Sequence, residues 1–369
     1  MKSSSVAIPV AKRTSDAAGD PVKEAISGFE YSGTRCFIPV GIDVSADTFD
    51  AAVAVDNNHT LRLGSFPNTK TGVKSLILIL ARLSRKSTGC RVVMEATNVY
   101  YRLVAFGIHE SGVAEVAVVN PRAAKHFALA QGERAKTDAV DARILALFAE
   151  RMPCALWSPP DPEADRLKFI SRRIGDLTDD IIREKNRLAA ARKGMSPACV
   201  VSDIESSVKI LTLKIDALRK EARKTIDASP SLSLAFSLLL TVIGVGEVTA
   251  TSLLAEIVSV PKGLTARQWV AMAGLDPKPY ESGKSVKKKT VISKQGNKYL
   301  RHAVFHAALV ISRYDPNANA WKTRLVEKRH KAKMQAIAAV MRKLIVGIHA
   351  MFRTNSTFNP ALLFPASAS

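Results

Sequence analysis

The segment from Cys36 to Val119 constrains the fold most, because its apolar residues follow a strand pattern three times before a helical pattern begins. The runs Cys36 to Val44, Phe49 to Val55 and Leu61 to Phe66 have strand length, and the short polar segments between them resemble hairpin turns. Apolar residues at helical spacing follow from Thr71 to Lys86. Three hairpin-linked strands ahead of a helix predict the first half of a mixed sheet.

Further strands alternate with helices in the second half of this segment. Arg91 to Met94 and Val113 to Val119 have strand character, and Tyr100 to Ser111 has helical spacing. Another apolar-periodic helix begins after Lys136. The order predicts an α/β domain with a mixed sheet and helices on both faces of that sheet.

Asp138 and Asp141 lie three positions apart at the start of the last of these helices, so their like charges are neighbours. One interpretation is a solvated acidic first turn with Lys136 and Arg143 as partners. The other is that a divalent cation lies between the two carboxylates. Asp43 favours the cation, because a carboxylate inside the apolar run GIDVS needs a partner or a metal.

Glu95 directly follows a predicted strand, and Asp43 lies mid-strand or at the end of another. Chemistry in open α/β sheets gathers at strand ends. Oxygen ligands without His or Cys are typical of Mg²⁺ or Mn²⁺ sites. Two such ions can hold both oxygens of an in-line phosphoryl displacement. The sequence therefore predicts one metal site that is formed by Asp43, Glu95, Asp138 and Asp141.

The charge balance predicts a nucleic-acid partner, since 54 Lys and Arg against 33 Asp and Glu give a formal net charge of +21. A membrane surface also attracts basic proteins, but no uninterrupted apolar run has membrane-spanning length, and we expect no membrane partner. The four cysteines lack C-x-x-C spacing, which indicates neither a zinc site nor a disulfide framework. Without a signal-peptide pattern, we expect a cytoplasmic, nucleoid-associated protein.

Two long apolar-periodic stretches follow the α/β segment. Asp165 to Leu188 and Ile204 to Ala222 have heptad-like spacing, and the helix-breaking cluster Lys193 to Pro197 separates them. They predict a pair of helices that forms an antiparallel or intermolecular coiled coil. A plain helical hairpin packed on its own domain is an equally good interpretation.

Leu232 to Thr251 has the pattern helix, Gly244-Val245-Gly246 turn, helix. This pattern fits a helix-hairpin-helix, in which backbone N–H groups at the start of the second helix bind a nucleic-acid phosphate. A purely structural turn between two helices is the alternative.

Leu275 to Arg301 is unusually basic and predicts a loop that contacts nucleic-acid phosphates. Ser282 and Ser285 lie among its lysines, although a hydroxyl is a weak nucleophile unless a base or a metal activates it. The predicted nucleic-acid-binding residues of this loop and of the Gly-x-Gly turn are Gly244, Gly246, Lys284, Lys287, Lys288, Lys289, Lys294, Asn297 and Arg301.

Seven short pieces occur in the order GIDVS, VMEAT, KTDAVDA, IGVGEVTA, AMAGLDP, ESG and SKQGNKYLR. Together they resemble the transposases of insertion-sequence family 110, from about Gly41 to about Ala350. The resemblance implies a RuvC-like, RNase H-fold nuclease domain with an Asp-Glu-Asp-Asp tetrad. It also implies a coiled coil that supports oligomers and a C-terminal transposase domain with an essential serine. Members act as recombinases with Mg²⁺ on element ends and target DNA, and a structured RNA guides those that have been studied.

Carried over by position, the tetrad corresponds to the four carboxylates named above, and the serine corresponds to Ser282 in ESG. Ser285 and Ser293 are the fallbacks. The resemblance implies that Ser282 attacks a DNA phosphodiester to form a phosphoserine link, within a dimer or tetramer. Ile243 and Gln295 depart from the family pattern without touching the tetrad. Two alternatives remain. One is a RuvC-type metal-dependent junction nuclease without serine chemistry, and the other is a non-enzymatic nucleic-acid-binding protein.

The predicted organisation has five parts. An α/β RNase H-like (RuvC-like) mixed-sheet domain covers residues 36–155, after a tail at 1–35. A coiled-coil helical linker follows at 160–228, and a mostly α transposase domain with the helix-hairpin-helix and the serine covers 230–352. Residues 353–369 are predicted to be a second tail.

Overall fold

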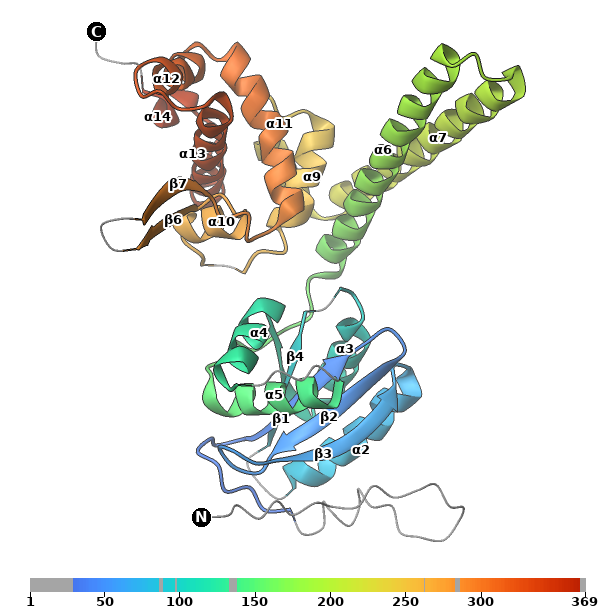
Figure 1. Ribbon diagram of the computed structural model, residues 1–369, viewed down its shortest axis with the longest axis vertical. Helices are drawn as coiled ribbons and strands as arrows, with labels where there is room; N and C mark the ends of the chain where they lie inside the picture. The colour runs from blue at the N-terminus through green and yellow to red at the C-terminus, as the bar shows by residue number, and fades with distance from the viewer. Residues whose placement is uncertain are drawn as a thin grey trace. The chain divides into compact units, whose positions relative to one another are not determined.

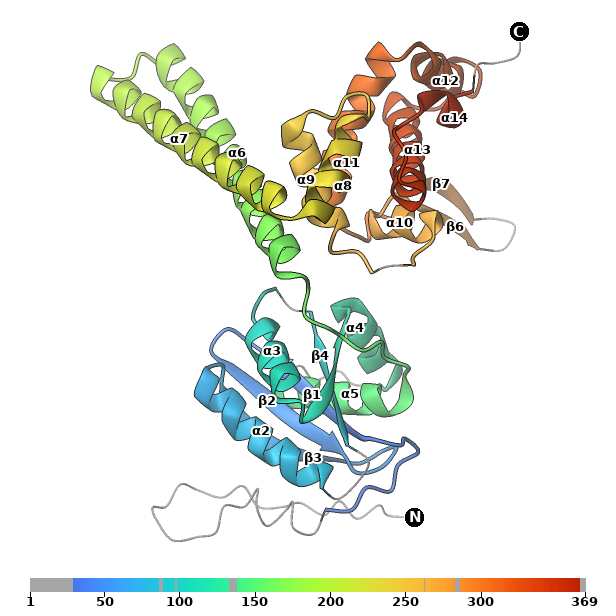
Figure 2. The same ribbon diagram turned by 180° about the vertical axis from the view of Figure 1, so that it is seen from behind.

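The chain divides into two compact units, Met1–Pro159 and Pro160–Ser369, each with a hydrophobic core of its own (Figures 1 and 2). The predicted tails lie outside the described residues at 1–28 and 366–369. The computed structural model describes residues 29–85, 89–96, 98–132, 138–261, 263–282 and 286–365, without the side chains at 138, 139, 280–282 and 286–289.

The first unit is built on a mixed sheet with the strand order β3-β2-β1-β4-β5. Strand β1 pairs antiparallel with β2 and parallel with β4, and β4 pairs parallel with β5. The predicted mixed sheet is therefore present. Its strands are β1 (Ile38–Val44), β2 (Thr48–Ala54), β3 (Thr60–Pro67), β4 (Cys90–Glu95) and β5 (Ala114–Val119).

Two helices cover each face of this sheet. Helices α2 (Lys70–Ser84) and α3 (Tyr101–Ser111) lie on one face, and α4 (Pro121–Ala130) and α5 (Asp138–Arg151) lie on the other (Figures 1 and 2). Alternate residues of β1 and β4 are apolar and pack with α2 and α3 in the larger core of the unit. The residues between them face α4 and α5, where Val93 packs in a smaller cluster.

Helix α4 is absent from the predicted elements, although its start carries a clear signal. The side chain of Asn120 accepts a hydrogen bond from the backbone of Arg122 at 2.9 Å, and Pro121 occupies the first turn. Both are preferred residues at helix starts. An Asn-Pro pair is also common at the end of a strand, and the sequence pattern assigns this pair to the end of the strand that precedes it.

Residues 29–35 pack against the first unit, although the prediction assigns them to a tail. Phe29 is buried, and the hydroxyl of Tyr31 donates to the carboxylate of Glu150 at 2.5 Å. The backbone and hydroxyl of Thr34 donate to the same carboxylate at 2.9 Å each. Glu150 lies near the end of α5 and is only 1% exposed, so these donors satisfy a buried charge. The unit therefore begins before residue 36.

The second unit begins with the two long helices α6 (Pro162–Lys193) and α7 (Ala198–Ala228), which pack on each other within the chain. Ile174, Leu177 and Ile215 form a small buried cluster between them. Gly194 and Met195, which has a φ of 52°, turn the chain at the predicted breaker cluster. The helix pair is thus an antiparallel hairpin, and its pairing with a second chain stays a prediction.

The rest of the second unit is mostly helical, and α11 and α13 run through its core. By length and composition alone, helix α13 is long and apolar enough to cross a membrane. Half of its most apolar segment is buried inside the unit. A core helix that buries one face accounts for this composition. The elements are α8 (Pro230–Leu240), α9 (Glu247–Ile257), α10 (Ala266–Met272), α11 (Lys298–Tyr314), α12 (Pro316–Glu327), α13 (Lys333–Thr354) and α14 (Pro360–Leu363).

Two features of this unit correct the sequence prediction. The basic stretch predicted as a loop contains the antiparallel hairpin β6 (Pro277–Ser282) and β7 (Val286–Ile292). The predicted second tail packs on the unit as far as Phe364, which is fully buried. The ring centres of Phe364 and Trp321 are 5.7 Å apart. The sequence pattern misses the hairpin because lysines occupy positions where apolar alternation would mark a strand.

Candidate functional site

Two of the predicted carboxylates lie at the carboxyl ends of neighbouring parallel strands. β1 and β4 pair in register as far as Ile42 and Met94, so Asp43 and Glu95 are the next residues on the two strands. Gly41, two positions before Asp43, faces α5, and alternation along a strand directs Asp43 to the same face. Both carboxylate side chains are half-buried. The structure therefore brings these two predicted residues together.

Helix α5 brings a third predicted carboxylate to this face. A Cβ placed on Gly41 would lie 2.6 Å from the carbonyl carbon of Leu145 and closer still to the backbone of Ala142 and Ala146. Only a glycine allows this close approach, so α5 crosses directly over β1. Asp141 immediately precedes Ala142, and its side chain is half-buried. The part of α5 that directly follows Asp141 is thus fixed against the strand that carries Asp43.

The donor set fits a hard divalent cation, because Asp43, Glu95 and Asp141 supply only carboxylate oxygens from a half-buried surface. The backbone of Asp138 begins α5, while its side chain lies outside the described residues. Among the side chains that the structure describes, no three His, Cys, Asp or Glu residues are grouped closely enough to hold a metal ion. The three described carboxylates do not form a closed ligand set by themselves.

Asp50 is a further carboxylate on this face that the sequence prediction misses. It is the Cα partner of Asp43 in the β1–β2 register and is 6% exposed. Arg62 donates to its Oδ1 at 2.7 Å and Ser65 donates to its Oδ2 at 3.1 Å. Like charges on directly opposed residues destabilise a sheet, and Arg62 offsets this repulsion. The available signal was an acid within the apolar strand FDAAVA.

The predicted serine lies at the end of a strand. Ser282 is the last residue of β6 and is the Cα partner of Val286, the first residue of β7. Its side chain and those of Lys287, Lys288 and Lys289 lie outside the described residues, as do Lys284 and Ser285 altogether.

The fallback Ser293 lies at the base of the same hairpin. Its hydroxyl donates to the carboxylate of Asp276 at 2.5 Å, and its backbone N–H donates to the carbonyl of Asp276 at 2.8 Å. Both interactions close the hairpin where it leaves the helical body. This gives Ser293 a structural role at the base of the hairpin.

The two glycines of the predicted helix-hairpin-helix have different surroundings. Gly244 has a φ of +86°, and a Cβ on it would lie 2.7 Å from the Cβ of Val310 on α11. A left-handed backbone and close packing both require glycine there, as a structural turn does. Gly246 is exposed at the start of α9, with open space around it. Phosphate binding by this turn stays a prediction, and Gly246 is the better placed of the two.

Asn297, a predicted nucleic-acid contact, uses both ends of its side-chain amide within the protein. Its Oδ1 caps α11 by accepting from the backbone of Tyr299 and Leu300 at 3.0 and 3.1 Å. Its Nδ2 donates to Glu256 at 2.6 Å. The carboxylate of Glu256, which is 3% exposed, also accepts two hydrogen bonds from Arg172 at 2.9 and 3.1 Å. This buried carboxylate therefore links α6, α9 and the start of α11.

Replacing Glu256 by glutamine is expected to lower the free energy of unfolding of the second unit by about 2 kcal/mol, because the charged partner of two Arg172 hydrogen bonds is lost. Chemical denaturation of the full chain measures this change. Glu205, which pairs with Arg192 at 2.6 Å and is about half exposed, supplies the matched control. Its replacement by glutamine should change stability by less than about 0.5 kcal/mol. Equal effects of the two substitutions would contradict a buried network around Glu256.

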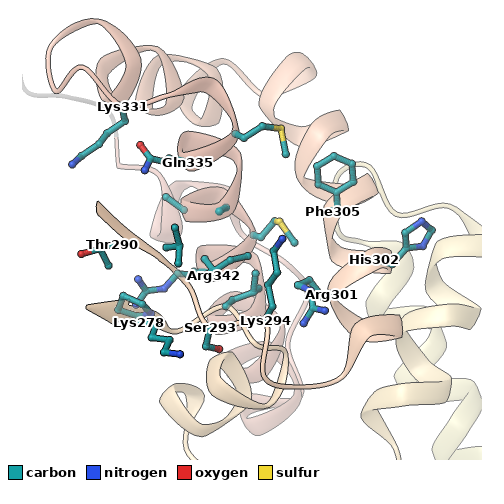
Figure 3. Close-up of a pocket in the computed structure, with 18 of the residues that line it drawn as sticks. Lys278, Thr290, Ser293, Lys294, Arg301, His302, Phe305, Lys331, Gln335 and Arg342 are labelled. Atoms are coloured by element: carbon teal, nitrogen blue, oxygen red, sulfur yellow. The ribbon is translucent and has the colours of Figure 1, made fainter. Parts of the chain in front are cut away.

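A groove of about 1040 Å³ lies between the β6–β7 hairpin and helices α11 and α13 (Figure 3). Two predicted nucleic-acid contacts line it, namely Lys294 and Arg301. Arg301 also donates to the carbonyl of Ala273 at 2.9 Å, which fixes its guanidinium at the rim. No Asp or Glu occurs among the described residues that line the groove. The formally charged side chains among these described lining residues are therefore all cationic.

Comparisons with known proteins show the family of the chain. Residues 40–197 match the DEDD family model for IS110, described as a transposase, and residues 236–322 match the transposase IS116/IS110/IS902 family. The pilin gene-inverting protein of Moraxella bovis is 30% identical over 322 residues, which is 87% of this chain and 97% of the relative. A protein of the same name from Moraxella lacunata matches with the same identity and coverage. The chain belongs to the IS116/IS110/IS902 family of transposases.

Proposed function

We propose that this transposase cuts and rejoins DNA through a phosphoserine intermediate formed by Ser282, with the help of divalent metal held by Asp43, Glu95, Asp138 and Asp141. Family membership supports action on DNA and, through the DEDD domain, dependence on a divalent metal. Two observations support the proposal: Asp43 and Glu95 lie at the ends of neighbouring parallel strands, and the backbone of α5 packs on β1 directly after Asp141.

Each residue has a chemical role in this proposal. The Oγ of Ser282 forms a bond to phosphorus while one phosphorus–oxygen bond of the DNA backbone breaks, and the leaving deoxyribose oxygen takes up a proton. The four carboxylates provide oxygen ligands for Mg²⁺ or Mn²⁺. When bound, such an ion stabilises the negative charge that develops on the phosphate and favours the ionised hydroxyl. Attack by a DNA hydroxyl on the phosphoserine then restores the serine and rejoins the strand.

Rejoining distinguishes this proposal from a RuvC-type nuclease, which would only cut. A relative named for inverting a pilin gene supports rejoining, because an inverted segment must be reconnected at both ends. The family resemblance supports a structured guide RNA and nucleoid-associated action on element ends and target DNA. Exposed apolar residues along the α6–α7 hairpin, such as Ile182 and Leu213, support its pairing in a coiled-coil dimer or tetramer.

The test is to trap the covalent intermediate. The full chain is incubated with a circular element junction, target DNA and RNA from the flanking non-coding sequence, in the presence of Mg²⁺. We expect a protein–DNA adduct, and mass spectrometry of its peptides should place the phosphate on Ser282. A chelator should prevent adduct formation.

Serine variants complete this test. Ser282→Ala should form no adduct, whereas Ser293→Ala should still form one if it folds, because Ser293 is held by Asp276 at the base of the hairpin. Cut DNA without any adduct would refute the serine chemistry and favour the nuclease alternative. A phosphate found on Ser285 would identify Ser285 as the nucleophile and refute the assignment to Ser282.

A further inference from the structure

The groove beside the β6–β7 hairpin combines an apolar floor with a cationic rim (Figure 3). Val291 on β7 and Met334 on α13 are 59% and 62% exposed, and Phe305 adds an aromatic ring from α11. Ala338 and Ala339 are small and half-buried, which leaves the floor hollow. The cations that line the groove are Lys278, Lys294, Lys298, Arg301, Lys331 and Arg342.

These two properties require an occupant that is anionic and also presents apolar surface. Phosphates alone would satisfy the six cations, but they would leave the exposed side chains of Val291 and Met334 in water. The volume is at the upper end of the ~300–1,000 Å³ that pockets for small ligands have, and it is far too small for a duplex. Within DNA, base faces become available only when a base is unpaired and unstacked.

The position of the groove connects it to the proposed chemistry. Lys278 lines the groove and precedes Ser282 by four residues on β6, which is about 13 Å along a strand. A DNA strand that reaches Ser282 therefore passes close to the groove.

We propose that this groove holds an unpaired nucleotide of the DNA strand, with its base on the apolar floor and its flanking phosphates on the lysine and arginine rim. The proposal rests on the proposed action on DNA and adds a site that distinguishes single-stranded from duplex DNA. Base contact with the floor supplies affinity that is independent of sequence, since every base has an apolar face.

Binding measurements can separate base contacts from phosphate contacts. The full chain carrying Ser282→Ala, with a chelator present, is titrated by fluorescence anisotropy with a 12-nucleotide thymidine strand and with an abasic strand of the same length and charge. We expect the thymidine strand to bind about tenfold more tightly than the abasic strand. Equal affinities would overturn the proposal.

Variants on α13 locate the effect. Ala338→Phe fills the floor and should reduce the preference for thymidine to within about twofold, while the dependence of affinity on salt stays the same because the phosphate contacts remain. Ala350, exposed on the same helix and outside the groove, provides the matched control Ala350→Phe, which should keep the full preference. Met334→Gln should weaken the preference about threefold without changing the helix, since Met334 is largely exposed.

Three results would contradict the groove as a nucleotide site. The first is an equal loss of preference in Ala338→Phe and Ala350→Phe. The second is a preference that appears only with an RNA strand of the same length. The third is a change in oligomeric state in Ala338→Phe without any change in DNA binding, which would assign the groove to a second copy of the chain. Neither cutting nor adduct formation enters these measurements, so failure of the serine chemistry and failure of the groove proposal are distinguishable.

Discussion

Asp43→Asn is expected to slow strand exchange by about a thousandfold while DNA binding persists. Asparagine has the shape of aspartate but lacks the charge that a hard cation needs, and Asp43 lies beside Glu95 at the end of a parallel strand pair. Loss of one group that stabilises transition-state charge lowers a rate by roughly this factor. Strand exchange between labelled DNA substrates gives the rate, and calorimetric titration with Mn²⁺ in the absence of DNA should show weaker metal binding.

Asp47→Asn provides the matched control for this prediction. Asp47 lies in the exposed turn between β1 and β2, so the same chemical change should leave both exchange and Mn²⁺ binding within about twofold. An Asp43→Asn protein that exchanges strands at more than a tenth of the normal rate and binds Mn²⁺ normally would show that Asp43 is not a metal ligand. A normal rate of strand exchange together with weaker Mn²⁺ binding would show that Asp43 binds a metal that the reaction does not need.

Gly41→Ala should destabilise the first unit by on the order of 4 kcal/mol, because the new methyl group would overlap the backbone of α5. Overpacking in a well-packed core costs about 1–3 kcal/mol when side chains can move aside, and here the obstacle is helix backbone. For a unit of this size, the loss corresponds to a fall in melting temperature of roughly 10 °C. Differential scanning calorimetry of the full chain measures it.

Gly175→Ala is the opposite case and serves as the control. Gly175 lies within α6, and a Cβ on it would meet no atom within 4 Å. Alanine should therefore stabilise the helix by about 0.5–1 kcal/mol. A Gly41→Ala protein that melts within about 2 °C of the original would mean that α5 can withdraw from β1 without cost, and that Asp141 is not held against the strand of Asp43.

The positions of the strands in the first unit follow from the sequence, because each strand has to bury apolar residues at alternate positions. The same alternation places Asp43 on the α5 face, and the parallel register places Glu95 beside it. Asp50 escapes the pattern because its neutralisation depends on Arg62, which lies on a different strand. The periodicity of one segment cannot show which side chain of another segment faces it.

The second unit shows the same limit more strongly. Arg172 and Glu256 are 84 positions apart, and nothing in either segment indicates that an ion pair with a buried carboxylate joins them. Asn297 is predicted from the sequence to contact a phosphate. In the structure its side-chain amide instead caps α11 and donates a hydrogen bond to Glu256. The β6–β7 hairpin lies in a lysine-rich stretch where charge obscures strand character. The prediction identified the kinds of residue that matter here, and the packing determined which of them face inward.

The hydrogen bonds between Glu150 and residues 31–35 have a consequence for choosing where the domain starts. The family match begins at residue 40, so a fragment cut at that point would lose both Tyr31 and Thr34. Glu150 would then lose the hydrogen bonds that Tyr31 and Thr34 donate to its carboxylate near the end of α5, a loss of a few kcal/mol. Because Asp141 lies on the same helix, a fragment that begins at residue 40 would weaken the element that supplies two of the four proposed metal ligands.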